Sequence, residues 1–470
     1  MIVAKFGGTS VSSPSQIKTI YKIVLGQIHK KPVVVVSAIS GVTDLLFALG
    51  KIENNQFDET IFAIKDKHIN LIDQVWKNDS VKKEIISYID EQIKEIKILC
   101  KKNKFNKACL DKLASYGEIM SSFIVACYFN KRGLRAKQVI ASDIITTNDD
   151  FGSAEFLHDL TKTRIDKILK PIVQDGVVPV VTGFIGSTIS GKTTTLGRGG
   201  SDYSASIIGL CLDAKEVQIW TDVDGVFTAD PRCVRKAKLI PSISYREASE
   251  LASFGARVLH PRTIKPAIKA NIPVKVLNTF NPKSVGTLII DKVDYSNPIT
   301  AIAFKRKVSL VNIYSTEMLL RKGFLVKVFS VFAKNNISVD LVSVSEVSIS
   351  VTLDNDENLP NAQKEIAFFA GVSVMKNYST ISLIGESIAN SPTIIKDIFN
   401  ILSKDNIQIK MISLGATDIN IGLVIDSQNL DRAVNVLHDK LLMKHRIRFK
   451  TKEGQIQKTA LENYRYKAIN

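Results

Sequence analysis

The stretch Ile2-Val-Ala-Lys-Phe-Gly-Gly-Thr-Ser10 indicates the fold class, because an apolar strand ends there in a lysine and two glycines. A helical stretch over 15–30 leads to a second strand, Val33-Val-Val-Val36, which is apolar on both faces. Strands of this kind are typical of sheets that helices cover from both sides. The sequence therefore predicts an α/β layer structure as far as about residue 290. The expected helices lie within 45–104 and over 111–132, 161–174 and 202–212, and the expected strands over 136–140, 177–182, 216–221 and 274–276.

An internal repeat follows Pro298. The block from Phe329 to Ser343 recurs in register as the block from Phe399 to Ser413. Each copy reads strand, helix, strand, strand, with the first strands over 309–314 and 379–384. Such repeated units usually pack together and bury a shared face, so we expect two small α+β units of βαββ type.

The charge balance is strongly basic, with 63 Lys and Arg against 46 Asp and Glu and a net charge of +17. A nucleic-acid-binding protein would need an RNA-binding motif or basic residues interleaved with exposed aromatics, and the sequence has neither. No apolar run approaches the roughly 18 residues of a membrane span, and no secretory signal is visible. We therefore expect a cytoplasmic protein without nucleic-acid or membrane partners, and we interpret 446–470 as a basic tail.

The cysteines and histidines do not indicate a metal site. The five cysteines are never spaced as Cys-x-x-Cys, and the six histidines include no His-Glu-x-x-His. A metal held mainly by the protein is therefore not expected.

A P-loop expression occurs at Gly186-Ser-Thr-Ile-Ser-Gly-Lys-Thr193. A working P-loop needs a helix that begins at its Lys-Thr pair. Here the chain continues with threonines and glycines, which are poor helix formers. The sequence instead predicts a glycine-bearing hairpin that leads to the real site.

Three other segments form a better candidate site. Lys5 ends the first strand beside Gly7 and Gly8, where backbone amides can approach a phosphate. The segment Gly197-Arg-Gly-Gly-Ser-Asp202 precedes a helix and offers a cation beside the helix N-terminus. The segment Trp220-Thr-Asp-Val-Asp-Gly225 ends a buried strand, at the edge where open α/β sheets bind ligands.

Together with three further segments, these resemble the aspartokinases of the amino acid kinase family. The further segments are Ser37-Ala-Ile-Ser-Gly-Val-Thr43, Ser115-Tyr-Gly-Glu118 and Phe254-Gly-Ala-Arg-Val-Leu-His-Pro261. The resemblance implies a three-layer sandwich with a mainly parallel sheet over 1–295. It also implies ACT-like regulatory domains over 308–378 and 379–445. The similarity is to the monofunctional, lysine-sensitive branch.

The implied reaction transfers the γ-phosphoryl group of ATP to the β-carboxylate of L-aspartate, the first step of the diaminopimelate route to lysine, threonine and methionine. The resemblance implies Mg²⁺ held mainly by the nucleotide. The implied catalytic residues are Lys5, Gly7, Gly8 and Asp202, and the implied substrate-binding residues are Thr43, Glu118, Arg198 and Ser201. The implied ATP-binding residues are Thr221, Asp222, Phe227, Arg232 and Arg257.

Three positions leave alternatives open. Phe227 and Arg257 stand where the family commonly has tyrosine and lysine. Without the resemblance, Glu118 reads as a solvated helix residue. Another carboxylate kinase of the same family remains the alternative function.

Feedback inhibition by L-lysine is implied as well. The implied effector residues are Met318, Phe324, Leu325, Ser338, Val339, Asp340, Ser345 and Glu346. Asp340 or Glu346 could neutralise the ammonium group of the effector, while the apolar members of the set could equally be ordinary core. Arg321 replaces a small polar residue of the lysine-sensitive pattern, so regulation by threonine stays open. ACT domains pair between subunits, which predicts a homodimer or a dimer of dimers.

Overall fold

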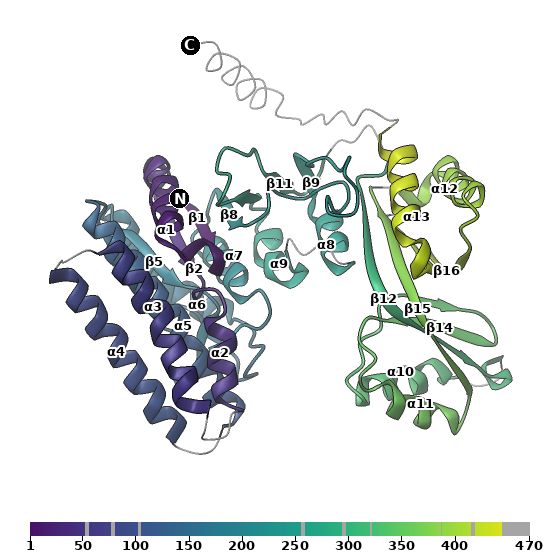
Figure 1. The fold of residues 1–470 in the computed structure, drawn as a ribbon, viewed down its shortest axis with the longest axis horizontal. Coiled ribbons are helices and arrows are strands. Elements are labelled where there is room, and N and C mark those ends of the chain that lie inside the picture. The colour runs from purple at the N-terminus through teal and green to yellow at the C-terminus, as the bar shows by residue number, and fades with distance from the viewer. Residues whose placement is uncertain are drawn as a thin grey trace, which may run out of the picture. The chain divides into compact units, whose positions relative to one another are not determined.

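The computed structural model describes residues 1–51, 56–76, 80–101, 105–254, 259–293, 298–319, 322–386, 388–414 and 419–443 (Figure 1). Contacts divide the chain into two compact units. The first comprises residues 1–226 and 258–291, and the second comprises 227–257 and 292–470. Residues 227–254, which the sequence predicted within the catalytic domain, thus make their contacts mainly with the second unit.

The first unit is built on a mainly parallel sheet, as the sequence predicted. Its strands run in the order β3-β5-β2-β1-β8-β10-β11. The pairs from β3 to β10 are parallel, and only β10 with β11 is antiparallel. The strands are β1 (Ile2–Phe6), β2 (Pro32–Val36), β3 (Ala136–Val139), β5 (Val178–Thr182), β8 (Glu216–Thr221), β10 (Val274–Asn278) and β11 (Thr287–Ile290).

Helices bury both faces of this sheet. The helices are α1 (Pro14–Gly26), α2 (Val42–Leu49), α3 (Phe57–Val75), α4 (Ser80–Lys101), α5 (Lys107–Lys131), α6 (His158–Gln174), α7 (Gly200–Cys211) and α9 (Pro261–Lys269). Figure 1 shows α3, α4 and α5 side by side. Alternate strand residues such as Ala4 and Val34 join the core cluster of α1 and α5. Val3 and Val33 are equally buried but lie outside that cluster, while α7 contacts β1 and β8. This alternation explains why the strands are apolar on both faces.

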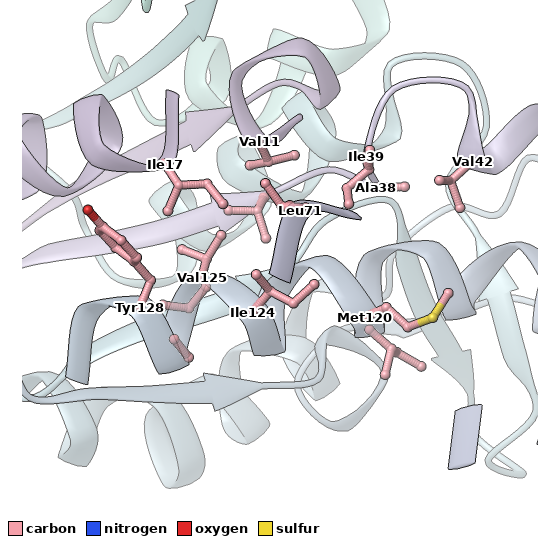
Figure 2. Close-up of a cluster of buried hydrophobic side chains, with 14 of the residues drawn as sticks. Val11, Ile17, Ala38, Ile39, Val42, Leu71, Met120, Ile124, Val125 and Tyr128 are labelled. Atoms are coloured by element: carbon pink, nitrogen blue, oxygen red, sulfur yellow. The ribbon is translucent and has the colours of Figure 1, made fainter. Parts of the chain in front are cut away.

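Figure 2 shows the middle of the cluster on the α5 side. Ile17 of α1 and Val11 lie opposite Ile124, Val125 and Tyr128 of α5, and all five side chains are buried. At about 0.8 kcal/mol per buried CH₂ group, this contact stabilises the packing of α5 against α1, and α5 also contacts β2, β3 and β5 of the sheet. The helix that carries Glu118 is therefore well anchored.

The P-loop expression forms a hairpin, so the prediction is confirmed. A small sheet contains β4 (Thr146–Thr147), β6 (Ile185–Thr188) and β7 (Thr193–Thr195). Strands β6 and β7 are antiparallel, with Ile185 opposite Thr195. Gly191 has a φ of 82°, which fits the tight turn between them. Lys192 is exposed at this turn, and α7 begins only at Gly200.

The second unit contains one antiparallel sheet built from both repeats. Its order is β13-β14-β12-β15-β17-β16. The strands are β12 (Ala301–Tyr314), β13 (Val342–Val344), β14 (Ser348–Leu353), β15 (Gly371–Ile384), β16 (Ile409–Leu414) and β17 (Asn420–Asp426). The helices are α10 (Phe324–Lys334), α11 (Leu359–Ala367), α12 (Pro392–Lys404) and α13 (Leu430–Leu437). Residues 227–254 add β9 (Ser242–Ser244) and α8 (Tyr245–Ser253).

The two long strands β12 and β15 serve both repeats. Residues 309–314 of β12 pair with β14, whereas 301–305 pair only with the end of β15, beside β17. A register shift between Lys305 and Val308 separates the two halves. The first residues of β12, which precede the predicted boundary at 308, therefore complete the half-sheet of the second repeat. Each half has its own hydrophobic core.

Among the described helices, we find none with the length and apolar character that a bilayer crossing requires.

Candidate active site

A cavity of about 510 Å³ lies where β1 and β2 end and α7 begins. This is the edge at which open α/β sheets bind ligands. The segments Lys5–Gly8, Ser37–Thr43 and Gly197–Asp202, far apart in the sequence, meet here. The predicted site residues that line it are Lys5, Gly8, Thr43, Glu118, Arg198, Ser201 and Asp202.

Lys5 is held by an ion pair. Its Nζ lies 2.6 Å from Oδ1 of Asp202, and the two side chains are 12% and 14% exposed. Asp202 belongs to the first turn of α7, where the helix dipole favours a negative charge. The pair keeps the lysine ammonium beside the helix N-terminus, so a cation and backbone amides face the cavity together.

The two glycines after Lys5 have different surroundings. A Cβ on Gly8 would lie 2.7 Å from the carbonyl oxygen of Ala38, so only glycine fits there. The amide of Gly7 donates to the carbonyl oxygen of Trp220 (3.2 Å) and extends the pairing of β1 with β8. Of the two residues, Gly8 is the one that lines the cavity.

Glu118 is a buried carboxyl on α5, only 2% exposed, which excludes its interpretation as a solvated helix residue. The amide of Ala38 donates to its Oε1 (3.2 Å). Its Oε2 has no hydrogen-bond partner among the residues that the structure describes. Burial disfavours the charged form and raises the pKa of Glu118 to about 8. Such a carboxyl is suited to an incoming ammonium group, which would stabilise its ionised form.

Arg198 supplies an exposed cation on the same cavity. It stands between Gly197 and Gly199, whose φ angles of 77° and 70° require glycine. A Cβ on Gly199 would also lie 2.7 Å from Cγ2 of Thr263. The backbone around Arg198 is thus built for a close approach to α9.

Phe184 is a cavity residue that the sequence did not predict. It has a φ of 70°, which is unusual for a bulky residue, and its amide donates to Oγ of Ser204 (3.0 Å). A Cβ on Gly200 would lie 2.5 Å from Cδ2 of Phe184. The one sequence feature that could have indicated Phe184 as a cavity residue is its position just after the buried strand Val178–Thr182.

The predicted nucleotide residues fall in both units. Thr221 and Asp222 lie at the carboxyl end of β8, with Oγ1 of Thr221 donating to Oδ1 of Asp222 (3.1 Å). Phe227, which bridges to Leu239, and Arg232 belong to the second unit. Nη2 of Arg232 lies 2.8 Å from Oδ2 of Asp230. Arg257 lies outside the described residues.

The predicted effector residues are partly core and partly surface. Met318, Phe324 and Val339 pack in the core of the first repeat, while Leu325 is 41% exposed. Ser338, Ser345 and Glu346 are exposed. Arg321 lies outside the described residues.

Asp340 already has a partner of its own chain. Nζ of Lys305 lies 2.7 Å from Oδ1 of Asp340 and 3.2 Å from Oδ2 of Asp354. Burial disfavours the Lys305 ammonium, but hydrogen bonds and attraction from the two carboxylates outweigh it and raise the pKa of Lys305. Burial also raises the pKa of Asp340, and the hydrogen bond and charge of Lys305 oppose that rise.

Within the described part of the chain, no three His, Cys, Asp or Glu side chains gather closely enough to hold a metal ion.

Comparisons with known proteins indicate the family of this chain. The model of the amino acid kinase family matches residues 1–278, and that of the ACT domain matches 381–441. Aspartokinase 1, chloroplastic, of Arabidopsis thaliana is 37% identical over 93% of this chain and 79% of that protein. Lysine-sensitive aspartokinase 3 of Escherichia coli is 34% identical over 94% of this chain and 99% of that protein.

Solved structures show the same likeness. The crystal structure of E. coli aspartokinase III in complex with aspartate and ADP superposes with a TM-score of 0.82, at 34% identity, over 94% of this chain and 100% of that one. The complex of the same protein with lysine and aspartate gives 0.83 over 94% and 99%. The chain therefore belongs to the amino acid kinase family, whose fold it shares. Within that family it is an aspartokinase with an ACT regulatory part, and the predicted enzyme class and fold are confirmed.

Proposed function

We propose that the cavity holds L-aspartate between Glu118 and Arg198, and that Lys5 stabilises the phosphoryl group in transfer from ATP to the β-carboxylate. The observation that carries the proposal is the buried carboxyl of Glu118, whose Oε2 is unpaired among the described residues, on the same cavity as the Lys5–Asp202 pair. Glu118 then takes the α-ammonium and Arg198 the α-carboxylate, with Thr43 and Ser201 as hydrogen-bonding groups. The E. coli relative was solved with aspartate and ADP, which supports this assignment.

The chemistry requires little acid–base help. The attacking β-carboxylate is ionised at neutral pH and is already a nucleophile. The enzyme has to align two anions and offset the charge that spreads over the transferred group. Lys5, the Gly8 amide and the first amides of α7 would supply that stabilisation, and Asp202 would hold the Lys5 ammonium in position.

The nucleotide would bind as its Mg²⁺ complex through Thr221, Asp222, Phe227, Arg232 and Arg257, with the metal held mainly by its phosphates. Thr221 and Asp222 stand at the end of β8, next to the Lys5 strand in the sheet. Phe227 offers a ring without a hydroxyl, and the guanidinium of Arg232 suits phosphate oxygens.

A coupled assay of ADP release tests the substrate. We expect release to depend on L-aspartate and to be near background with L-glutamate, whose longer side chain would misplace its carboxylate by about one methylene group. Equal rates with the two acids would favour the alternative of a different carboxylate kinase of the same family.

The P-loop-like lysine provides a separate prediction. Lys192→Ala is expected to leave kcat and the KM for ATP within about twofold of the unchanged enzyme, because an exposed hairpin side chain contributes little. Steady-state kinetics at varied ATP checks this. A large rise in the KM for ATP would show that the hairpin contacts the nucleotide.

We infer feedback inhibition by L-lysine through Met318, Phe324, Leu325, Ser338, Val339, Asp340, Ser345 and Glu346. The name of the lysine-sensitive E. coli relative and its complex with lysine support this effector. In the described structure the Lys305 ammonium forms an ion pair with Asp340. The effector ammonium would therefore have to displace Lys305 from this carboxylate.

This competition can be measured. Lys305→Met is expected to lower the lysine concentration for half-inhibition by about tenfold, because Asp340 loses its internal partner. Asp340→Asn should raise the lysine concentration for half-inhibition, because the neutral amide no longer attracts the effector ammonium. Lys376→Met, which removes the exposed pair with Asp356, is the matched control. Inhibition by threonine instead, or none by either, would remove lysine as the effector and leave the kinase assignment intact.

We also infer a homodimer or a dimer of dimers formed through the ACT repeats. Leu325, itself a proposed effector residue, is exposed, and so are Val326, Val344 and Val347, which adjoin proposed effector residues in the sequence. A contiguous patch of exposed apolar side chains is typical of interaction surfaces. Light scattering after size-exclusion chromatography would give the mass.

A further inference from the structure

Asp111 is a buried carboxylate that none of the proposed roles uses. It lies on α5, two helical turns before Glu118, and is 1% exposed. Three donors converge on it at 2.8 Å each. The amides of Gly152 and Thr195 donate to Oδ2, and the hydroxyl of Thr195 donates to Oδ1. Burial raises the pKa of Asp111, and these three hydrogen bonds oppose the rise.

Both residues held by Asp111 line the cavity. Thr195 ends β7, three residues before Arg198. The amide of Ala154 donates to the carbonyl oxygen of Thr195 (2.9 Å), and a Cβ on Gly197 would lie 3.3 Å from the carbonyl oxygen of Gly152. The segment 152–154 therefore packs directly beside the backbone that carries Arg198.

Arg262 holds the same segment from the other side. Its guanidinium donates to Oγ of Ser153 (2.8 Å) and to the carbonyl oxygens of Ser153 (3.0 Å) and Ala154 (3.2 Å). It also lies over the ring of Tyr203 on α7, 5.6 Å from the centroid. Asp111 of α5 and Arg262 of α9 thus both hydrogen-bond to the segment 152–154.

We propose that Asp111 is a positioning residue for aspartate recognition, because it fixes Thr195 and Gly152 and thereby sets the place of Arg198 relative to Glu118. Arg198 is exposed and flanked by two glycines, so its own backbone does little to hold it. Asp111 and Glu118 share one helix. Helix α5 therefore positions both recognition groups: it carries Glu118 for the α-ammonium, and through Asp111 it fixes the segment that carries Arg198 for the α-carboxylate. Preorganised binding requires such a rigid support. This inference rests on the proposed roles of Arg198 and Glu118.

Two substitutions at Asp111 separate positioning from charge. In Asp111→Asn the amide group can turn so that its oxygen accepts both backbone amides while its NH₂ donates to Oγ1 of Thr195. We expect this variant to keep its KM for aspartate within about threefold. Asp111→Ala removes all three acceptors, and we expect its KM for aspartate to rise about thirtyfold, with the KM for ATP within about threefold.

A merely structural role predicts a different result. Asp111→Ala would then lower the active fraction, and hence the apparent kcat, without changing the KM for aspartate, and that outcome would overturn the proposal. If Asp111→Ala does not fold, Thr195→Val tests the same point, because it removes only the hydroxyl bond. We expect Thr195→Val to raise the KM for aspartate severalfold and to leave the KM for ATP unchanged. An unchanged KM for aspartate would contradict the proposal. Asp166→Ala, which breaks partly exposed ion pairs within α6, is the control.

Arg198→Ala distinguishes failure of this inference from failure of the proposed function. If Arg198→Ala leaves the KM for aspartate unchanged, the substrate assignment is wrong. If Arg198→Ala raises that KM but Asp111→Ala does not, only the positioning role of Asp111 is wrong.

Discussion

Replacing Lys5 by methionine is expected to lower kcat by about 10²–10³-fold, the usual effect of removing one preorganised donor from a charge-developing transition state. The lysine is held 2.6 Å from Asp202 and is largely shielded from water, so its charge acts at a fixed place. Because the stabilisation belongs to the transition state, the KM for aspartate should change far less than kcat. Steady-state kinetics with saturating ATP measures both.

Two variants give the controls for this result. Lys192→Ala removes a lysine that follows a glycine but lies in the β6–β7 hairpin, and this variant should have normal activity. Asp202→Asn weakens the hold on Lys5 and should lower kcat without removing the ammonium. Near-normal kcat in Lys5→Met, in protein with the circular dichroism of the unchanged enzyme, would show that Lys5 does not contact the transferred group.

The second large effect is a pH dependence set by Glu118. Burial raises its pKa to about 8, so in the free enzyme the carboxyl is mostly protonated at pH 7 and ionised above about pH 8. The ammonium of aspartate needs the ionised form. We therefore expect kcat/KM for aspartate to rise with pH until about 8 and then to level off. Aspartate binding at pH 7 should release close to one proton, which calorimetry in two buffers detects.

Glu118→Gln should raise the KM for aspartate by about 10²-fold and remove this rise with pH, because a neutral amide neither ionises nor pairs with the ammonium. Glu91→Gln, an exposed carboxyl on α4, is the matched control and should keep the profile of the unchanged enzyme. A flat pH profile in the unchanged enzyme, with no proton released, would mean that Glu118 is not the ammonium partner.

Much of the site was predictable from local sequence. Lys5, Gly8 and Arg198 stand in short glycine-bearing segments that follow strands or precede a helix, and chain connectivity brings such segments to one edge of a parallel sheet. The hairpin at Lys192 was predictable for a similar reason, since threonines and glycines do not continue a helix.

Other features depended on contacts between distant segments. The periodicity of α5 did not show that Glu118 is buried, because that helix is covered on most of its surface. Asp111 gave no local signal, since its donors lie 41 and 84 residues away. Phe184 was missed because its backbone conformation is imposed by α7.

The boundary between the two units also came only from the structure. Residues 227–254 continue the chain after β8, yet Ile302 donates its amide to the carbonyl oxygen of Thr228, and Oγ1 of Thr228 lies 2.9 Å from Nε2 of the buried His438. The start of β12 likewise pairs beside the second repeat. Sequence proximity therefore does not show with which core a segment packs.

Strand and helix periods and glycine turns are local properties of the chain, so the amino-acid pattern was enough to predict the layered α/β part, the repeated regulatory part and the segments that meet at the cavity. The burial of Glu118 and its raised pKa, the ion pair of Lys5 with Asp202 and the ion pair of Lys305 with Asp340 became visible only in three dimensions. Desolvation and ion pairing depend on what surrounds a charge in space, and those surroundings come from residues far apart in the chain.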